Sequence, residues 1–492
     1  MRGCAPRVNV LRGKPNWNRY QVPSIFGLWL TWGLPFLVAQ AVPTVRETEF
    51  RSRWVDLQVD RPREDVLAEK PEAAAEPESV PRMVAAVRSF FRNSPVDLRG
   101  GLSAGWEYSN EYSSFQPDKN TSTSSFFVAP VIAAFYDRDI GPWTVSARYS
   151  AGYVYYFDDN YYPGTGANTL PSQTAGLDLR LERARLRVQS NAAGSYGSGF
   201  DIERGDQTER FAVAENLSAD YQLTEYLRTG VGGSAAYEHY SGESGGFDDR
   251  HTRLAGTLYG DYFWTGKTRL RLELGTGSES QDNGSSSVLD RTYAQALMRA
   301  YIQWSEKVNI EAGAGLALFE ESGFEGASEE ALRPVYQVSI AYVPTEKTSV
   351  RIFAGREATS VAPNLSLLVN WRPRLNTNVT LSIYQQASLS TVASGQDRIA
   401  QGALLNFGQR VFQRIDAGLG GGIEQEEYRA VGDQQPLSSG DPYYFVFTSL
   451  GWEVNRRLLL QGRWQISSRQ DFGQTTEDGL RTRASLSFRL TF

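Results

Sequence analysis

The feature of this sequence that most constrains its fold is a strict alternation of apolar and polar residues. In the stretch WTVSARYSAGYVYYF, residues 143–157, every second residue from Trp143 to Phe157 is apolar or aromatic, and Thr144, Ser146 and Arg148 stand between them. Successive side chains of an extended strand point to opposite faces, so a period of two gives one apolar and one polar face. The stretch LRTRASLSFRLTF, residues 480–492, alternates in the same way. The sequence therefore predicts strands with two unlike faces.

The alternation recurs from residue 96 to residue 492, divided by two kinds of connection. Short charged turns, such as 265–267 and 345–347, alternate along the chain with long polar segments, such as 428–441. A first strand near 96–108, nine hairpins and a last strand at 480–492 make twenty strands. The hairpins are expected at about 124–157, 173–199, 209–240, 251–279, 291–320, 334–359, 363–388, 400–427 and 443–469. An even strand count with short turns at one end and long loops at the other is typical of single-chain outer-membrane barrels. We therefore predict an all-β fold, a transmembrane antiparallel up-and-down β-barrel of about 18–20 strands.

Other fold classes fit this pattern less well. No apolar run of helical membrane length follows the first 45 residues, which excludes a bundle of membrane helices. A soluble sandwich would have to bury all the apolar faces in one core from a chain of roughly 400 residues, more than such sandwiches usually contain. A propeller or β-helix would show a fixed sequence repeat, and none is found.

The first 95 residues differ in character from the rest. Five basic residues precede the apolar stretch IFGLWLTWGLPFLVAQA, which ends at Ala39-Gln40-Ala41, so residues 1–41 are expected to be a cleaved signal peptide. An uncleaved membrane anchor is the alternative. Removal of residues 1–41 would take the formal net charge from −6 to −11 and would remove the single cysteine, Cys4. Residues 42–95 are expected to be a periplasmic Pro/Ala/Glu-rich linker with a short amphipathic helix, and residues 96–492 the outer-membrane barrel.

The final strand resembles a known export signal. Phe492 ends the sequence on the apolar face, with Leu490 and Phe488 before it on the same face. This pattern is similar to the carboxy-terminal signal by which outer-membrane barrels are passed to the barrel assembly machinery. The chain as a whole resembles the putative-porin type of bacterial barrel, including barrels that accompany exopolysaccharide genes. The resemblance implies location in the cell outer membrane and an assembly role for Phe488, Leu490 and Phe492.

Few residues suit catalysis. The chain has two His, three Met and one Cys, so no enzyme is predicted. The stretch SGESGG, residues 241–246, satisfies the G-x-S-x-G pattern, but it links two strands, whereas a nucleophile elbow joins a strand to a helix. His239 and His251 flank this loop, and the alternation places His239 on the lipid face and His251 on the inner face. A hydrolase site at this rim is the alternative.

No cofactor, metal or nucleic-acid site is predicted. Acidic loops, at Asp282 to Gly284, Glu320-Glu321 and Glu329-Glu330, carry the oxygen ligands that Ca²⁺ prefers, although most such loops are simply solvated. Zinc spacings and glycine-rich phosphate loops do not occur, and an acidic chain opposes binding to nucleic acid. The expected partners are outer-membrane lipid, the barrel assembly machinery and small polar solutes or polysaccharide, and the oligomeric state stays open.

The polar faces of the strands give the candidate pore lining. If the apolar faces contact lipid, the arginines between them face inward, because an arginine on the lipid face costs about 2–4 kcal/mol at the midplane. The predicted pore-lining residues are Arg99, Arg148, Arg180, Arg185, Arg187, Arg269, Arg271, Arg463, Arg481, Arg483 and Arg489. Small inward residues, such as Gly230 and Gly420, are expected to leave space in the lumen. The arginines could select solutes or could brace the wall by pairing with carboxylates.

These observations lead to a functional expectation. We expect a water-filled pore for the diffusion or export of small polar solutes or a glycan, because a barrel of this size is too wide for side chains to fill. The alternatives are a surface-exposed binding or structural barrel without conductance, and a loop-sited hydrolase. A gated receptor with an internal plug is disfavoured because residues 42–95 provide only 54 residues for the plug.

Overall fold

The computed structural model describes residues 96–112, 120–157, 169–201, 206–242, 248–282, 288–322, 328–390, 396–430, 442–468 and 480–491. The expected signal peptide, linker and helix, within residues 1–95, lie outside the described residues, as does Phe492. Among the described residues, no helix is long and apolar enough to cross a membrane.

Twenty strands make up almost all of the described chain. Their bounds are β1 Val96–Tyr112, β2 Asn120–Ile140, β3 Trp143–Tyr156, β4 Thr169–Glu182, β5 Leu186–Asp201, β6 Asp206–Gln222, β7 Leu227–Gly242, β8 Asp248–Thr265, β9 Thr268–Asp282, β10 Val288–Ser305, β11 Val308–Ser322, β12 Ser328–Thr345, β13 Thr348–Arg356, β14 Asn364–Arg374, β15 Thr377–Leu389, β16 Gln396–Val411, β17 Ile415–Ala430, β18 Tyr443–Asn455, β19 Leu458–Ser468 and β20 Leu480–Thr491. The predicted strand count is confirmed. Some turns inside the predicted hairpins are very short: β2 reaches Ile140, so its turn to β3 consists of Gly141 and Pro142.

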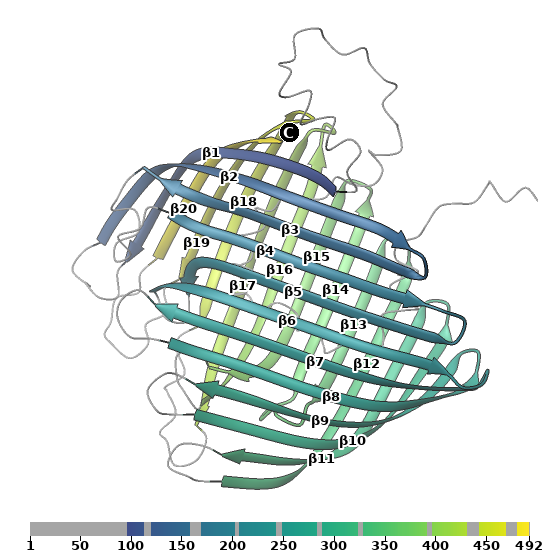
Figure 1. Cartoon of the computed structure of the whole chain (residues 1–492). Coiled ribbons are helices and arrows are strands. Elements are labelled where there is room, and N and C mark those ends of the chain that lie inside the picture. Colours follow the sequence, from purple (N-terminus) through teal and green to yellow (C-terminus); the bar gives the residue numbers. More distant parts are fainter. Residues whose placement is uncertain are drawn as a thin grey trace, which may run out of the picture. The chain divides into compact units, whose positions relative to one another are not determined.

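Each strand pairs antiparallel with the next along the chain, and the sheet closes on itself (Figure 1). The closing pair is β1 with β20, in a register that runs from Gly101 opposite Thr491 to Asn110 opposite Thr482. Closure removes the free edges that an open sheet would expose, so every strand in the described barrel has two hydrogen-bonded neighbours. The predicted closed antiparallel barrel is confirmed.

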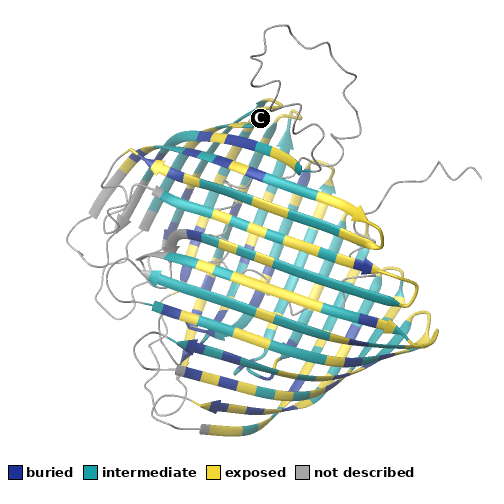
Figure 2. Cartoon of the chain, viewed as in Figure 1, coloured by how far each residue is buried: buried dark blue, intermediate teal, exposed yellow. Residues whose placement is uncertain are grey.

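The two faces of each strand meet different surroundings, as Figure 2 shows by the change of burial along each strand. On β8, Leu254, Leu258 and Trp264 point outward and are exposed. Tyr259 and Asp261 alternate with them, point inward and are buried. The outer face is therefore apolar and the inner face is polar, as in a barrel that stands in lipid with its interior away from lipid.

Aromatic residues border the apolar outer face. Near the short turns the exposed outward residues include Trp143, Trp264, Trp304, Trp371 and Trp452. Tyr153, Tyr155, Phe211 and Tyr444 lie outward toward the long connections. Two aromatic girdles around an apolar band mark the two membrane interfaces of an outer-membrane barrel. The protein is an integral protein of the cell outer membrane.

Candidate functional site

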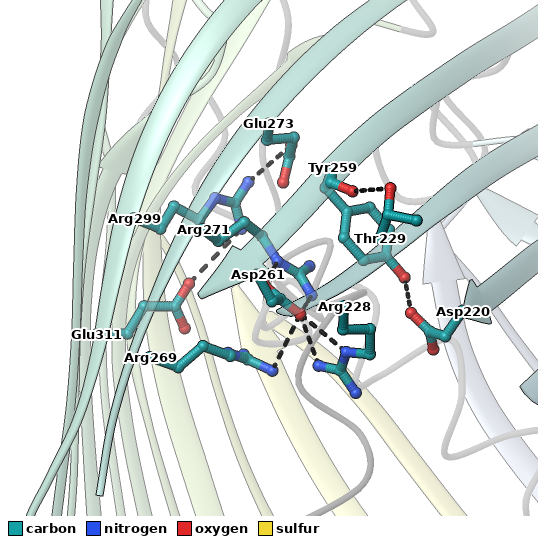
Figure 3. Close-up of polar contacts among 10 residues, drawn as sticks. All are labelled: Asp220, Arg228, Thr229, Tyr259, Asp261, Arg269, Arg271, Glu273, Arg299 and Glu311. Carbon is teal, nitrogen blue, oxygen red and sulfur yellow. Dashed lines mark hydrogen bonds and ion pairs between the residues drawn. The ribbon is translucent and has the colours of Figure 1, made fainter. Parts of the chain in front are cut away.

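The inner wall of β7, β8 and β9 is organised around one carboxylate, Asp261, which is completely buried. Arg228 of β7 donates to it at 2.6 and 3.0 Å, and Arg271 of β9 donates to it at 2.7 and 2.9 Å. Arg269 Nη1 lies 3.8 Å from the same carboxylate, as Figure 3 shows. Asp261 stands directly opposite Arg228 on one side and Arg271 on the other, so the strand register itself creates these contacts.

Tyrosine rings pack between these charges. The Arg271 guanidinium lies 3.9 Å from the centre of the Tyr259 ring, and that of Arg269 lies 3.9 Å from the centre of the Tyr301 ring. The Tyr259 hydroxyl donates a hydrogen bond to Asp220 of β6. A guanidinium over an aromatic face is held by the ring quadrupole while its edge stays free to donate. The rings therefore fix the orientation of the arginines.

A second carboxylate pair extends the cluster across β9, β10 and β11. Arg299 lies 3.2 Å from Glu273 and 3.5 Å from Glu311 (Figure 3). Figure 3 thus draws four arginines and four carboxylates. Asp261, Glu273 and Glu311 contact arginines, whereas Asp220 accepts from Tyr259. The ion pairs in direct contact brace the wall.

Nearer the long connections, a bridge joins strands that are not neighbours in the sheet. Arg291 of β10 donates to Glu321 at 2.6 Å and to both oxygens of Asp397 at 2.8 Å. Gln281 of β9 donates to the carbonyl of Ser390 at 2.9 Å. Asp397 is the second residue of β16 and Ser390 follows β15, so the end of this hairpin contacts the inner wall six strands away. The contacts therefore cross the lumen.

The connection between β13 and β14, residues 357–363, also lies against the inner wall. Its Ala358 is buried and packs with the inward residues Ala317 and Val335, beside Tyr293. Glu357 starts this connection. The surface of its side chain is exposed to water. The protein atoms packed around it nevertheless displace bulk water, and this desolvation raises the pKa of the Glu357 carboxyl group. Arg253 opposes the rise in pKa and Glu279 adds to it.

A third ion cluster lies on the inner face of β16 and β17. Arg398 contacts Glu424 at 3.1 Å and Glu426 at 2.6 Å, and both carboxylates are fully buried. Tyr384 donates to Glu424, and Tyr428 donates to Glu426 at 2.9 Å. Each carboxylate therefore has a guanidinium and a phenol as partners, which offsets the cost of its burial.

The predicted arginines fall into three groups in the structure. The strand alternation places the following on inner-face positions: Arg99, Arg148, Arg180, Arg187, Arg269, Arg271, Arg463, Arg483 and Arg489. Arg185 lies instead in the turn between β4 and β5, because β5 begins one residue later at Leu186. Arg481 is in β20, and its side chain lies outside the described residues.

Several of these arginines have partners. Arg483 forms an ion pair with Glu107 of β1, and Tyr156 donates to the same carboxylate at 3.2 Å. Arg489 Nε lies 3.4 Å from Ser103 Oγ. Arg463 lies 4.9 Å from the centre of the Phe447 ring. Arg483 and Arg489 therefore connect β20 with β1, whereas Arg463 of β19 contacts β18.

The expectation that inward glycines leave open space is wrong at two positions. A Cβ added at Gly230 would lie 2.5 Å from the Tyr259 ring, and one at Gly420 would lie 2.6 Å from the Phe447 ring. Aromatic side chains from the neighbouring strands already fill these places. The glycines accommodate rings rather than widen the lumen.

The two histidines point to opposite sides of the wall, as predicted. His239 lies 2.6 Å from Asp248 on the outer face, and His251 lies 2.8 Å from Asp249 on the inner face. Ser244, the candidate nucleophile between them, lies outside the described residues. The structure therefore does not bring the two imidazoles together.

The acidic pairs suggested as Ca²⁺ ligands are divided by the wall. Glu320 is opposite Glu330 on the outer face, and Glu321 is opposite Glu329 on the inner face, where Glu321 binds Arg291. Asp282 ends β9, and the two residues after it lie outside the described part. Within the described ranges, no group of three or more His, Cys, Asp or Glu side chains could hold a metal ion.

Sequence reasoning missed Asp261 and Arg291, the centres of two of these clusters. Only a partial signal existed for Asp261: the alternation places Asp261 and Arg271 on the inner faces of β8 and β9, which a two-residue turn joins. The turn alone would set residue 261 opposite Leu272, and a register shift between Phe263 and Thr265 sets it opposite Arg271. No comparable signal exists for Arg291, because its partner Asp397 is 106 residues away.

Comparison with known proteins gives likenesses in structure only. No family model matches the chain, and no curated protein matches it in sequence. The barrel is similar to the FrpB iron transporter from Neisseria meningitidis, with a TM-score of 0.47 and 10% identity over 80% of this chain and 83% of that chain. It is similar to the ferric yersiniabactin uptake receptor FyuA from Yersinia pestis, with a TM-score of 0.41 and 12% identity over 80% of each chain. It is also similar to the siderophore receptor PiuA from Acinetobacter baumannii, with a TM-score of 0.43 and 9% identity over 80% of this chain and 82% of that chain.

Proposed function

We propose that this barrel transports small polar solutes or a glycan across the outer membrane through a water-filled lumen, without catalysing a reaction. The observation that carries the proposal is the polar, charged inner wall of a twenty-stranded barrel. A barrel of this strand number encloses more space than its own side chains fill. A polar wall lets water and polar solutes pass without loss of hydration.

The lumen-crossing contacts supply a constriction on the side of the long connections. The bridge between Arg291 and Asp397 holds the end of the β15–β16 hairpin over the lumen, and residues 357–363 occupy the wall beside it. We therefore expect the protein to conduct weakly in this state and to conduct more when the bridge is broken.

The test is single-channel recording of refolded protein in planar bilayers. The variant Arg291→Gln removes the bridge and should raise the unitary conductance. Arg299→Gln is the matched control: Arg299 faces inward from the same strand, but its carboxylate partners Glu273 and Glu311 belong to the neighbouring strands. It should leave the conductance close to that of the wild-type protein.

The same bridge favours a second candidate function, a binding or structural barrel without conductance. A closed mouth would expose the long connections as a recognition surface while blocking the lumen. The absence of conductance in both the wild-type protein and Arg291→Gln, with the barrel folded, would contradict transport and favour this alternative.

A further inference from the structure

One acidic residue, Glu215, faces outward in the middle of a membrane-spanning strand. Its neighbours on the same face of β6 are Val213 and Leu217, which are 39% and 48% exposed on the outer surface. The opposite face of β6 carries Asp220, which is buried and bonded to Tyr259. The alternation therefore places the Glu215 carboxylate in the lipid.

The depth of Glu215 follows from the aromatic residues of the same face. Phe211 and Tyr221 both point outward, and ten residues of a strand tilted by about 40° rise about 25 Å, the height of the apolar band. Glu215 is four residues from Phe211 and six from Tyr221. It therefore lies near the membrane midplane, where a carboxylate costs free energy unless a partner compensates it.

No other described charged residue occupies such a position. Every other Asp, Glu, Lys or Arg that the alternation assigns to the outer face lies within three residues of a strand end, whereas Glu215 is nine residues after Asp206 and seven before Gln222. The strand-end residues are Arg138, Glu209, Asp248, Arg250, Asp282, Asp290, Glu320, Glu330, Arg356, Asp397, Glu427 and Arg429. Of these, Asp397 does not reach the outer face, because the bend of its hairpin holds it against Arg291 inside the lumen.

The outward side chains around Glu215 are small. Glu215 stands opposite Ala192 of β5 and Ala235 of β7. Five of its six nearest outward neighbours on these two strands are small, the sixth being Tyr237; the five are Ser190, Ala192, Gly194, Gly233 and Ala235. Within the described part of the chain, no side chain hydrogen-bonds or ion-pairs with Glu215. The carboxylate thus stands in a shallow depression that another side chain can enter.

The chemistry of the neutralising group identifies the occupant. Lipid acyl chains carry no donor. A second copy of this barrel, inserted in the same direction, presents outward arginines only at strand ends in the described ranges, so its described strands bring no cation to the midplane. A carboxyl group at that depth is stabilised either by protonation or by a cationic partner, and such a partner is a lysine or arginine of another chain at the same depth.

From this geometry we propose that the depression around Glu215 on β5, β6 and β7 is the contact surface for a different integral membrane protein. That protein presents a Lys or Arg side chain to the carboxylate at the membrane midplane. The small residues on β5 and β7 let the two walls approach closely enough for this ion pair.

The test is photo-cross-linking in intact outer membranes, with a photoreactive residue replacing Ala235. We expect one protein adduct, whose second component is a different outer-membrane protein with a basic residue in its membrane-embedded wall. The matched control is the photoreactive residue at Ala403, which also faces outward in mid-strand but lies on β16, ten strands from β6. It should give no such adduct.

Substitution of Glu215 decides whether charge holds the contact. Glu215→Leu and Glu215→Gln should both abolish the adduct while leaving the heat-modifiable, folded barrel at its normal level. Glu215→Lys combined with Glu in place of the partner's basic residue should restore it. An adduct of two copies of this chain, labelling of lipid alone, or an adduct that survives in Glu215→Gln would each overturn the proposal.

Discussion

At the scale of single residues, the inner wall is stabilised by ion clusters, and in one of them a single carboxylate holds several cations. Asp261 accepts from Arg228 and Arg271 and lies near Arg269, so three positive charges depend on one negative charge. Arg271 is itself completely buried. A buried ion pair that loses one partner leaves the other charge without water or counter-ion, which is far more costly than the net worth of the intact pair.

Asp261→Asn should therefore lower the free energy of unfolding by about 3–5 kcal/mol. Urea-induced unfolding in phospholipid vesicles, followed by tryptophan fluorescence, measures this value. Asp178→Asn is the control, because Asp178 also faces inward, from β4, but is exposed, and its loss should change stability by no more than about 0.5 kcal/mol. Equal effects of the two substitutions would contradict the bracing role of Asp261.

At the scale of strands and loops, local contacts were predictable and lumen-crossing contacts were not. Alternation fixed the face of nearly every residue, because it depends only on the period of an extended chain. The turn at Lys267 is local too, so the strands it joins could be paired from the sequence. The contact of Arg291 with Asp397 depends on how the β15–β16 hairpin bends over the lumen, and no short-range pattern records that bend.

Glu357 should make the packing of residues 357–363 sensitive to pH. Because enclosure raises its pKa, the folded protein binds a proton more tightly than the unfolded chain does. This contribution to stability is fully present below the ordinary glutamate pKa, about 4.3, and is lost as the pH rises through the raised value. The Tm of the Glu357→Gln variant should therefore be higher than that of the wild-type protein at neutral pH and equal to it near pH 4.

Circular dichroism melts in detergent between pH 4 and pH 8 measure that difference. Glu346→Gln is a suitable control, since Glu346 lies in the exposed short turn between β12 and β13. Its Tm should follow that of the wild-type protein at each pH. If the difference in Tm between Glu357→Gln and the wild-type protein is the same at every pH, Glu357 does not make the stability of this region sensitive to pH.

At the scale of the whole molecule, closure between β20 and β1 gives the last strand its importance. Phe488 and Leu490 point outward in β20, opposite Ala104 and Leu102 of β1. The sequence pattern predicted this seam because a two-faced final strand needs a partner on each side. The charge clusters on β7 to β11 were predicted only in part: Arg269 and Arg271 were among the expected inner-wall residues, whereas their partner Asp261 was not.

The assembly role of the final strand remains a prediction. Deletion of Phe492, or its change to Asp, should sharply lower the amount of folded protein in the outer membrane, because the resemblance to the assembly signal implies that the machinery recognises this residue. Heat-modifiability on gels of purified outer membranes measures folded protein. Leu332→Asp, which also puts an acid on the outer face but is far from either end of the chain, controls for a charge in lipid. Wild-type levels after loss of Phe492 would refute the signal.

The seam between β20 and β1 also provides a direct test of the ion selectivity of the lumen. Arg481, Arg483 and Arg489 occupy inner-face positions on β20, and Arg483 already neutralises Glu107. Changing all three to Gln removes three positive charges and leaves that carboxylate facing the path. Charges act on a permeating ion over about 8–10 Å at physiological salt, so the local change outweighs the net charge of the chain.

The triple variant should therefore shift the reversal potential in a KCl gradient toward that of a cation-selective pore. Its lipid face is unchanged, but loss of the Arg483–Glu107 pair should lower its stability, so heat-modifiability must first show that the variant is folded. Arg138→Gln is the control, since Arg138 is on the outer face of β2 and has no access to the lumen. If the triple variant conducts with unchanged selectivity, the three arginines serve only to brace the wall. If selectivity shifts, the seam forms part of the ion path. The pairing of Arg483 with Glu107 then determines how much of the positive charge of Arg483 acts on a passing anion.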